Sequence, residues 1–427
     1  MISSWLAPRL ARHNIHYGWA MVAVTFLAAL VSAGVAGAPG VFIAPLQKEF
    51  GWSTAEISSA LSIRFFLFGL TAPFAAALMN RYGLRNVSFT ALVCVAMSLV
   101  VSLGMTQIWH MVALWGVLGG VGTGMTALVL GATVSTRWFT ARRGLVVGIM
   151  TASFATGQLV FLPLIATITE RAGWRSALGL LCAMLAVAAF AVLLVMRDRP
   201  SDLGLRPYGD NGTDPLTAPP PGSGSIMSAA LAALRDASKS WVFWALFATF
   251  FVCGASTVGL IQVHLIPMCA DFGIPQVQAA GLLAAIGVFD FIGTIVSGWL
   301  SDRYDNRWLL FWYYGLRGLS LLVLPMTDFS FYGLSLFAVF YGLDWVATVP
   351  PTVRLTAQRF GAERANLVFG WIFCGHQLGA AAASLAGGLS RTLWATYLPA
   401  FFFAGVLCIV AALVAIMIAR QPKPLVA

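Results

Sequence analysis

Five ionisable side chains lie inside long apolar stretches of this 427-residue chain, where a charge is costly. They are Arg64, Asp290, Arg317, Asp344 and His376. An ionised side chain at the centre of a bilayer costs at least about 2.5–3.5 kcal/mol, so each is a candidate for a functional site. A guanidinium can bind a carboxylate through two parallel hydrogen bonds, a buried aspartate can carry a proton, and a histidine can bind an anion or relay a proton. Together these side chains could bind an anion and transfer a proton.

The apolar stretches that carry these residues define the class of protein. The chain is 59% hydrophobic and only 9% charged, whereas an ordinary soluble domain is about 25% charged. Apolar runs of about 20 residues, long enough to cross about 30 Å of hydrocarbon as a helix, recur along the whole length. We therefore predict an all-α, polytopic membrane protein with twelve transmembrane helices. The predicted spans are 17–44, 54–79, 86–105, 109–136, 143–168, 175–197, 241–269, 277–301, 308–327, 331–356, 364–389 and 393–419.

The basic residues predict how these spans run through the membrane. With the N-terminus placed inside, most Lys and Arg side chains fall on cytoplasmic flanks, and only Lys48, Arg171, Arg175 and Arg391 lie outside. This bias follows the positive-inside rule. The net charge of +10 therefore reports topology and gives no reason to expect a nucleic-acid partner. We predict a multi-pass protein of a bacterial-type cytoplasmic (inner) membrane, with both termini in the cytoplasm.

Between the sixth and seventh predicted spans the composition changes to Pro, Gly, Asp and Ser. Such a segment can neither cross a bilayer nor form a core, so we predict a cytoplasmic linker at 198–239. It separates an N-terminal six-helix bundle, 1–197, from a C-terminal six-helix bundle, 240–427. Two stretches with a shared skeleton, AALMNRYGLR at 76–85 and GWLSDRYDNR at 298–307, occupy the same loop of each half. The repeat indicates two pseudo-symmetric halves.

The second of these stretches resembles the loop signature of the major facilitator superfamily, approximately G-x-x-x-D-R-x-G-R-R. It keeps Gly298, Asp302, Arg303 and Arg307, whereas the first copy has Asn80 in place of the acid. The resemblance implies that the acid and the arginines hold the two halves together at the cytoplasmic side until the cavity opens inward. Simple anchoring of the arginines at the inner surface is the alternative. The implied gating residues are Asp302, Arg303, Arg81 and Arg85.

Four further stretches, in the right order along the chain, are similar to the monocarboxylate porter and oxalate:formate antiporter branches of this superfamily. This resemblance covers most of the chain and implies a secondary transporter, whose two halves expose a shared cavity alternately to each side of the membrane. The stretches are GVFIAPLQKEFGWS at 40–53, RWFTARRGLVVGI at 137–149, VHLIPMCADFGI at 263–274 and GWIFCGHQLG at 370–379.

The same resemblance places the eighth span along the cavity, which makes Asp290 the expected proton carrier and a part of the substrate site. Monocarboxylate porters have D-x-x-x-R on this span, with the arginine binding the carboxylate, but here Thr294 stands at the arginine position. Another cation is then needed, and we expect Arg64, on the second span, to bind the anion, followed by His376. The alternative for Arg64 is a pair with an acid or with helix carbonyls, and for His376 a bond to a backbone carbonyl.

Arg317 and Asp344 are expected to form a structural ion pair. The resemblance places the ninth span on the outer side of its bundle, so Arg317 should turn inward and meet Asp344, or else Asp290, at a similar depth. Removing one partner of a buried pair leaves an uncompensated charge, at a cost of about 3–5 kcal/mol. Such a change would affect folding more than selectivity.

These expectations combine into one function. We predict a secondary active transporter that moves a small organic monocarboxylate together with a proton and acts as a monomer, without a cofactor or a bound metal. Exchange of organic anions without net protons, and export of a larger amphipathic compound, are the alternatives. An enzyme is not expected, because neither H-E-x-x-H nor G-x-S-x-G occurs in the chain.

Overall fold

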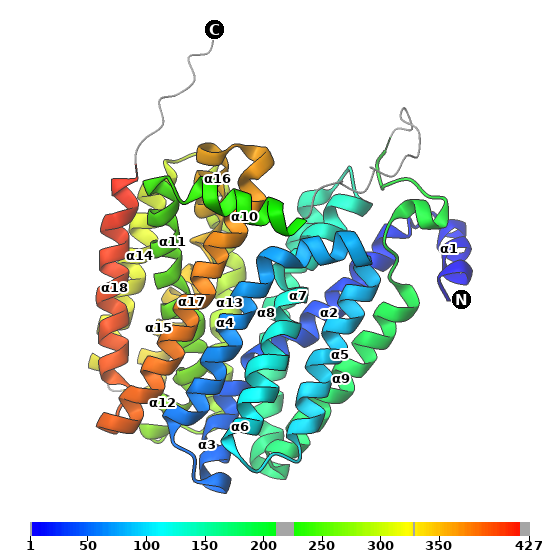
Figure 1. Cartoon of the computed structure of the whole chain (residues 1–427). Helices are drawn as coiled ribbons and strands as arrows, with labels where there is room; N and C mark the ends of the chain where they lie inside the picture. Colours follow the sequence, from blue (N-terminus) through cyan, green and yellow to red (C-terminus); the bar gives the residue numbers. More distant parts are fainter. Residues whose placement is uncertain (1, 211–225, 328, 419–427) are drawn as a thin grey trace.

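The computed structural model describes residues 2–210, 226–327 and 329–418, and this part of the chain is helical with no named strand (Figure 1). Before the linker the helices are α1 (Ile2–Arg12), α2 (Gly18–Gly37), α3 (Pro39–Phe50), α4 (Thr54–Tyr82), α5 (Leu84–Ser102), α6 (Ile108–Met111), η1 (Val112–Leu118), α7 (Gly119–Trp138), α8 (Arg143–Ala172) and α9 (Trp174–Val195). From the linker onward they are η2 (Pro200–Leu203), α10 (Ile226–Ala237), α11 (Trp241–Gly254), η3 (Ala255–Gln262), α12 (Val263–Asp271), α13 (Gln276–Ser301), α14 (Asn306–Val323), η4 (Leu324–Met326), α15 (Phe331–Asp344), α16 (Val349–Phe360), α17 (Ala362–Trp394) and α18 (Leu398–Met417).

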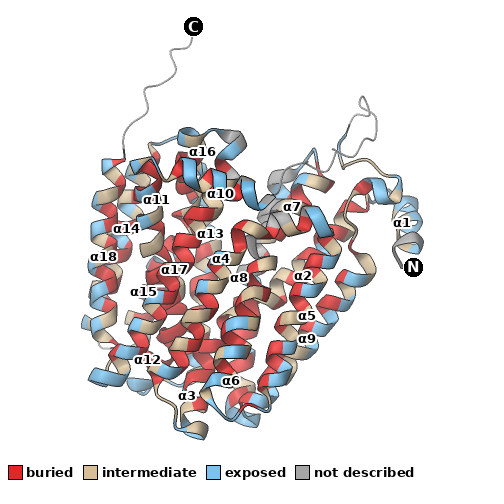
Figure 2. Cartoon of the chain, viewed as in Figure 1, coloured by how far each residue is buried: buried red, intermediate tan, exposed pale blue. Residues whose placement is uncertain are grey.

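The all-helical membrane fold predicted from the sequence is confirmed. In the described residues eleven helical segments are long and apolar enough to cross a bilayer. The predicted fifth span corresponds to α8, a helix of 30 residues that packs against α2, α9 and α13. Buried residues lie between the helices, and exposed residues, many of them apolar, lie on the outer faces (Figure 2). An apolar outer surface is what a lipid environment requires.

Two of the predicted spans are not continuous, which corrects the sequence-based boundaries. The first predicted span ends as α2 at Gly37, and α3 begins at Pro39. The tenth predicted span ends as α15 at Asp344, and α16 begins only at Val349. Proline has no N–H and its ring clashes with the carbonyl four residues earlier, so prolines next to such positions interrupt a helix.

Neighbouring α13 satisfies the backbone groups that the second break leaves free. Pro350 and Pro351 open α16, so the carbonyl of Ala347 cannot accept the usual hydrogen bond from four residues ahead. The Ser297 hydroxyl donates to that carbonyl instead. The break is therefore stabilised by a side chain from another helix, and a single-helix pattern in the sequence could not show it.

Helices from the two halves of the sequence run side by side. α4 packs along α17, α8 along α13, and α3 against α12 (Figure 1). Glycines allow close approach: a Cβ added at Gly69 would lie 2.7 Å from the Cβ of Gln377. At the end of the molecule opposite the linker, Ala55 N donates to Thr392 Oγ1 at 3.0 Å, and the Gln276 side chain donates to the Val41 carbonyl.

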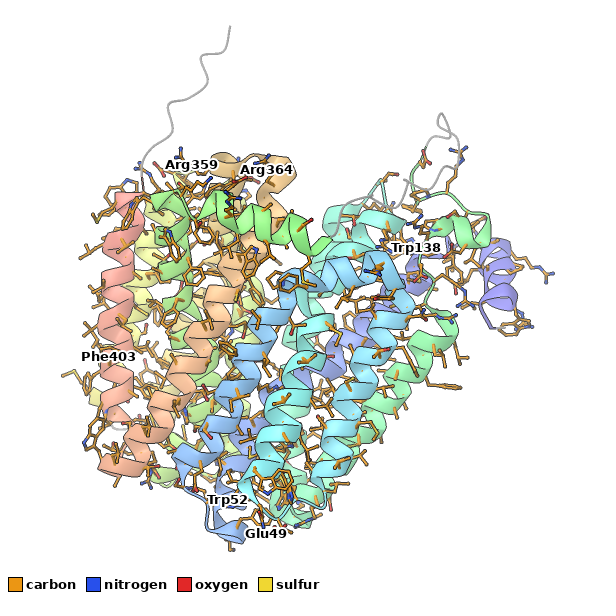
Figure 3. The ribbon with its side chains drawn as sticks, viewed as in Figure 1. Glu49, Trp52, Trp138, Arg359, Arg364 and Phe403 are labelled. Atoms are coloured by element: carbon orange, nitrogen blue, oxygen red, sulfur yellow. The ribbon has the colours of Figure 1, made fainter. Side chains whose placement is uncertain are left out.

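The linker end of the molecule carries α10, which rests on α17 and α4. The indole N–H of Trp371 donates to the Ala230 carbonyl of α10 at 2.8 Å. The Nη1 atom of Arg364 lies 3.5 Å from Asp236 Oδ2, in an ion pair. Figure 3 shows Arg359 and Arg364 at this end and Glu49 with Trp52 at the opposite end. The division into bundles at 1–197 and 240–427, joined by a linker at 198–239, stays a prediction.

Candidate functional site

Arg64 lies deep in the N-terminal half, on a helix whose start the sequence specifies clearly. α4 begins with a capping box, in which Ser53 Oγ accepts from Glu56 N at 3.2 Å and Ser53 N donates to Glu56 Oε2 at 2.8 Å. Gly120 of α7 allows close packing at Arg64, because a Cβ there would lie 2.7 Å from the Arg64 carbonyl oxygen. The Arg64 side chain is 6% exposed. Among the described residues it has neither an ion pair nor a hydrogen bond to a protein group.

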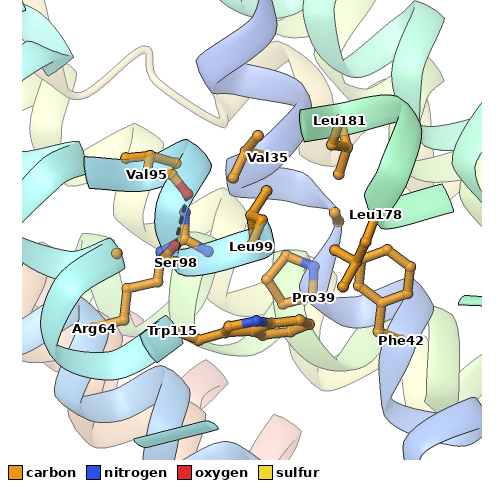
Figure 4. A pocket seen from close by; sticks show the side chains of 12 residues that line it. Val35, Pro39, Phe42, Arg64, Val95, Ser98, Leu99, Trp115, Leu178 and Leu181 are labelled. Atoms are coloured by element: carbon orange, nitrogen blue, oxygen red, sulfur yellow. Dashed lines mark hydrogen bonds between the residues drawn. The ribbon is translucent and has the colours of Figure 1, made fainter. Parts of the chain in front are cut away.

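The Arg64 side chain faces a small pocket with a cavity volume of about 20 Å³ (Figure 4). Its wall is mostly apolar, and three of its side chains carry polar groups: the guanidinium of Arg64, the hydroxyl of Ser98 and the indole N–H of Trp115. Ser98 Oγ donates its hydrogen to the Val95 carbonyl at 2.7 Å. The Trp115 Nε1 atom is buried and has no hydrogen-bond partner among the residues that the structure describes. The lining residues are Val35, Ala38, Pro39, Phe42, Arg64, Val95, Ser98, Leu99, Trp115, Gly119, Leu178 and Leu181.

An arginine without a partner in such a pocket has the chemistry of an anion site. Burying a charge costs free energy unless a partner compensates it, and no described side chain supplies that partner to Arg64. A carboxylate can accept two hydrogen bonds from a guanidinium. The pocket therefore combines a strong binding group for an anion with a mostly apolar wall.

The C-terminal half contains a second buried arginine, and its contacts are different. Arg317 on α14 is 1% exposed, and its Nε atom donates to Asp344 Oδ2 at 2.7 Å. Its other nitrogens donate to the Trp345 carbonyl at 3.1 Å and to Cys253 Sγ at 3.1 Å, and to the carbonyl of Asp344. The structure thus brings Arg317 to Asp344 rather than to Asp290 as its ion-pair partner. Each nitrogen of this guanidinium has a hydrogen-bond partner.

Asp290 lies on α13 beside the break between α15 and α16. Its Oδ1 atom accepts from Val346 N at 2.9 Å and from Thr294 Oγ1 at 3.0 Å. The carboxylate therefore caps a backbone N–H that the broken span leaves without a helical partner. Thr294, one helical turn further along α13, thus bonds to the acid directly. The side chain is 7% exposed, so this acid is removed from bulk water.

His376 is positioned by aromatic rings of its own half. It stacks on Phe373 with a centroid distance of 5.6 Å and an interplanar angle of 9°, and it contacts Phe250 at 5.0 Å. Its Nδ1 atom lies 3.4 Å from Gln377 Nε2. Of the three residues predicted to bind the substrate, Arg64 alone lines the pocket, since neither His376 nor Asp290 is part of its wall.

The pocket also differs from the predicted cavity shared by both halves. Its lining residues all come from positions 35–181, so it lies within the N-terminal half. The reason is the direction of each side chain on its helix. Arg64 points towards α5 and η1, whereas His376 on α17 packs against its own half. Position along a span predicts depth in the membrane but not the face of the helix.

Comparison with known proteins identifies the family. The profile of the Major Facilitator Superfamily matches residues 25–384 and also 265–427. The chain belongs to the major facilitator superfamily. It is accordingly a multi-pass membrane transporter and not an enzyme, as the sequence predicted.

Individual relatives in this superfamily include an uncharacterised transporter and a named one. The chain is 25% identical over 379 residues to the MFS-type transporter YcxA of Bacillus subtilis, covering 87% of this chain and 88% of that one. It is 26% identical over 393 residues to monocarboxylate transporter 13 of Rattus norvegicus, covering 91% and 86%. Among solved structures, a D-xylose-proton symporter superposes with a TM-score of 0.71 at 15% identity, covering 95% of this chain and 99% of that one. That likeness concerns the fold.

None of the four predicted gating residues of this superfamily member bonds to the opposite half in the described chain. Asp302 forms an ion pair with Arg354 of α16, and Arg303 Nη1 donates to the Trp299 carbonyl at 3.1 Å. The backbone N–H of Arg85 donates to Asp198 Oδ1 at 2.9 Å. Arg81 is exposed, with its guanidinium 5.4 Å from the centre of the Tyr82 ring. Among the described residues, none of these four side chains forms a hydrogen bond or an ion pair with the opposite half.

Sequence reasoning missed two polar groups of the pocket, Ser98 and Trp115. Both lie in apolar stretches and carry no charge, so neither attracts attention in a search for costly ionised groups. Trp115 did leave a signal: it directly precedes the glycine-rich segment 116–125. A tryptophan buried there needs a partner for its N–H. That criterion would have marked Trp115 as a candidate.

Proposed function

We propose that this transporter moves small organic monocarboxylates and that Arg64 binds the carboxylate. The observation that carries the proposal is the buried guanidinium of Arg64, which has no partner among the described residues and faces a mostly apolar pocket. A substrate that supplies one negative charge and a small apolar body complements both features. The likeness to a monocarboxylate transporter over 91% of the chain supports the same substrate class.

The pocket beside Arg64 is small in this conformation. Its cavity volume of about 20 Å³ is the space of about one water molecule, so the pocket would have to widen before a carboxylate could bind to Arg64. Its size therefore does not discriminate between a small substrate and the export of a larger amphipathic compound. Organic anion exchange stays the competing function, since it uses the same anion site without net movement of protons.

Proton coupling is the second part of the proposal, and Asp290 is the proposed carrier. Its environment supports the role, because a buried acid that bonds to Thr294 and to the Val346 N–H can exist with or without its proton. Protonation removes a charge that would repel an entering anion. His376, stacked beside Phe373, is the proposed second contact for the anion. Arg317 with Asp344 is proposed as a structural pair.

The proposed setting of the transporter includes its membrane, its orientation and its oligomeric state. We propose a monomer in a bacterial-type inner membrane. The basic residues at the linker end, such as Arg359 and Arg364, support the proposed orientation, with both termini and the linker in the cytoplasm. Asp302, Arg303, Arg81 and Arg85 would act as gating residues at that end. Their partners within each half, such as Arg354 for Asp302, would then be exchanged for partners across the halves when that end closes.

Uptake into proteoliposomes tests the proposal. Labelled carboxylates would be offered to the purified protein with and without an imposed pH gradient. We expect saturable uptake of monocarboxylates, stimulated by an inward proton gradient. Arg64→Gln should lower the affinity about 10- to 100-fold, since a hydrogen bond to a charged group is worth about 1.5–3 kcal/mol.

A matched control removes an arginine far from the pocket. Arg12→Gln at the end of α1, where the side chain is exposed, should leave uptake unchanged. The proposal is wrong if no monocarboxylate is taken up, or if Arg64→Gln binds the anion as well as Arg12→Gln does. Uptake that needs a preloaded anion and ignores the pH gradient would identify an exchanger instead.

A further inference from the structure

We infer that the pocket beside Arg64 binds one small inorganic anion, and chloride is the ion that it fits best. Two buried donors without partners in the described chain, the Arg64 guanidinium and the Trp115 indole N–H, would hold the ion. The inference goes beyond the proposed function, because the ion is a resident ligand and not the transported substrate. If Arg64 also binds the substrate carboxylate, as proposed above, the carboxylate must displace this ion.

The size of the pocket selects the ligand. Its cavity volume of about 20 Å³ holds about one water molecule. Chloride is a single atom only slightly larger than a water molecule, so it fits after small shifts of the wall. Nitrate, sulfate and a carboxylate each have several heavy atoms, and none of them fits unless the pocket widens. The pocket in this conformation therefore suits a single-atom anion.

Close packing of η1 on α4 brings the two donors to one pocket. Trp115 lies in η1, and its Nε1 atom is buried. A Cβ added at the next residue, Gly116, would lie 3.1 Å from the Ala60 carbonyl oxygen, one helical turn before Arg64. Phe42, whose ring centre is 5.8 Å from that of Trp115, packs beside the indole. Figure 4 shows Arg64 and Trp115 in the wall of the same pocket.

A negative charge satisfies this pair of donors better than a water molecule does. A water molecule could accept from both, but the buried charge of Arg64 would stay uncompensated, which costs free energy. No acidic side chain is among the lining residues, and none forms an ion pair with Arg64 in the described chain. A halide ion accepts hydrogen bonds from any direction, so one ion can accept from both groups.

The rest of the wall favours chloride over fluoride. The Ser98 hydroxyl gives its hydrogen to the Val95 carbonyl at 2.7 Å, and Leu99, Leu178 and Leu181 present only apolar side chains. The entering ion therefore exchanges most of its water for two donors. Fluoride holds its water more strongly than chloride does, so this exchange is less favourable for fluoride. Because the pocket is small, we expect the affinity to fall from chloride to bromide to iodide, with fluoride also weaker than chloride.

Thermal unfolding of the purified protein in detergent tests the inference. Chloride would replace methanesulfonate, which is too large for the pocket, at constant ionic strength. The wild type should show a saturable rise of its Tm with chloride, because a ligand that binds the folded state stabilises it. Arg64→Gln should abolish this rise. Trp115→Phe, which keeps an aromatic ring but removes the N–H, should raise the Kd for chloride about 10- to 100-fold, as expected for the loss of a hydrogen bond to a charged group.

Two exposed residues provide matched controls. Arg12→Gln removes an arginine at the end of α1, and Trp109→Phe removes an exposed indole whose N–H donates to Gln107 Oε1 at 2.8 Å. Both should keep the wild-type Kd for chloride. If the wild type shows no saturable rise, or if Arg64→Gln responds to chloride as Arg12→Gln does, the pocket holds only water and the inference is wrong. Equal Kd values for Trp115→Phe and Trp109→Phe also contradict it.

Uptake assays separate this inference from the proposed function. If Arg64 binds both anions in turn, chloride should raise the KM for a monocarboxylate without changing kcat. A Tm response that depends on Arg64, together with uptake that ignores chloride, supports the ion site and contradicts Arg64 as the residue that binds the substrate. If no monocarboxylate is taken up, the proposed function fails, and the unfolding assay still decides the inference on its own.

Discussion

In the part of the chain that the structure describes, two arginines are buried among the helices, Arg64 in the N-terminal half and Arg317 in the C-terminal half. Arg317 is surrounded by Asp344, Cys253 and backbone carbonyls, so its nitrogens all donate within the protein. Arg64 has no such partner in the described chain and faces a pocket instead. Burial is similar, at 1% and 6% exposure, and the difference lies in the partners. The charge of Arg317 is compensated within the protein, whereas that of Arg64 has no compensating group in the described chain.

The halves also differ in how they use acids. Asp344 forms the ion pair with Arg317, and Asp290 accepts hydrogen bonds at the break in the tenth span. The N-terminal pocket has no acid in its lining. An acid next to Arg64 would compete with the substrate anion, so its absence from the lining fits a binding role for Arg64. The comparison predicts opposite responses to mutation in the two halves.

The largest effect is expected in the C-terminal half. Arg317→Met should destabilise the protein by about 3–5 kcal/mol, because it leaves the buried Asp344 carboxylate without a cation. Thermal unfolding in detergent, followed by size-exclusion chromatography, measures the loss. The double variant Arg317→Met/Asp344→Leu should recover part of the stability, since it removes the stranded charge as well. A single variant as stable as the wild type would contradict a structural role for the pair.

Arg64→Met should give the opposite result. Its stability should stay within about 1 kcal/mol of the wild type or rise, because the substitution removes a buried charge that no described group compensates. Substrate-dependent stabilisation should disappear in the same sample. The same unfolding assay, run with and without the best monocarboxylate, measures both quantities. A loss of stability as large as that of Arg317→Met would make Arg64 a structural residue.

Asp290→Asn is expected to abolish the coupling of uptake to protons and to lower the stability of the protein moderately. The amide oxygen can still accept from Val346 N, so the cap on the broken span should persist at a cost of about 1–2 kcal/mol. An amide cannot carry the proton, so uptake should no longer respond to an imposed pH gradient. Thr294→Val provides a control that removes one hydrogen bond to Asp290 and keeps the acid. A pH response that survives in Asp290→Asn rules out Asp290 as the carrier.

The smallest effect is expected at the exposed pair of Glu49 and Arg175, at the end opposite the linker. The hydrogen bond from the Trp174 indole, at 2.6 Å, and then Arg175 lower the pKa of Glu49 below its ordinary value. A lowered folded-state pKa means that the stabilisation is present above the unfolded value of about 4.3 and is lost as the pH falls through the folded value. Glu49→Gln should therefore be slightly less stable than the wild type near neutral pH, and the two should converge below about pH 4.

Melting curves between pH 3 and pH 6 measure this convergence. Both side chains are more than one-third exposed, so solvent screens the pair and the difference should be small. A difference between wild type and Glu49→Gln that stays constant over this pH range would show that charge on Glu49 contributes nothing. Comparing the loss of stability in Glu49→Gln with that in Arg317→Met would show how much more a buried ion pair contributes than an exposed one.

The sequence was sufficient for the class of fold and for most helix positions, because apolar length is a local property. The second span was predicted at 54–79 and is α4, Thr54–Tyr82; the eighth was predicted at 277–301 and is α13, Gln276–Ser301. The break in the tenth span was not predicted. It depends on Ser297 and Asp290 from another helix, and a pattern within one span cannot show such partners.

The site was predictable in its residues but not in its arrangement. Counting along a span gives the depth of a charge, and it led to Arg64, Asp290, Arg317 and Asp344. It could not decide whether Arg317 meets Asp290 or Asp344, because that choice depends on the rotation of α14 and α15. The same limit explains why Arg64 and His376 were expected in one cavity, although Arg64 lines a pocket that His376 does not reach.

The hydroxyl of Ser297 replaces the N–H that Pro351 lacks, and the carboxylate of Asp290 accepts from Val346 on the other side of the same break. These two bonds connect α13 to the junction between α15 and α16. A change of charge on Asp290 would therefore alter a hydrogen bond that holds this junction, as well as the charge inside the C-terminal half.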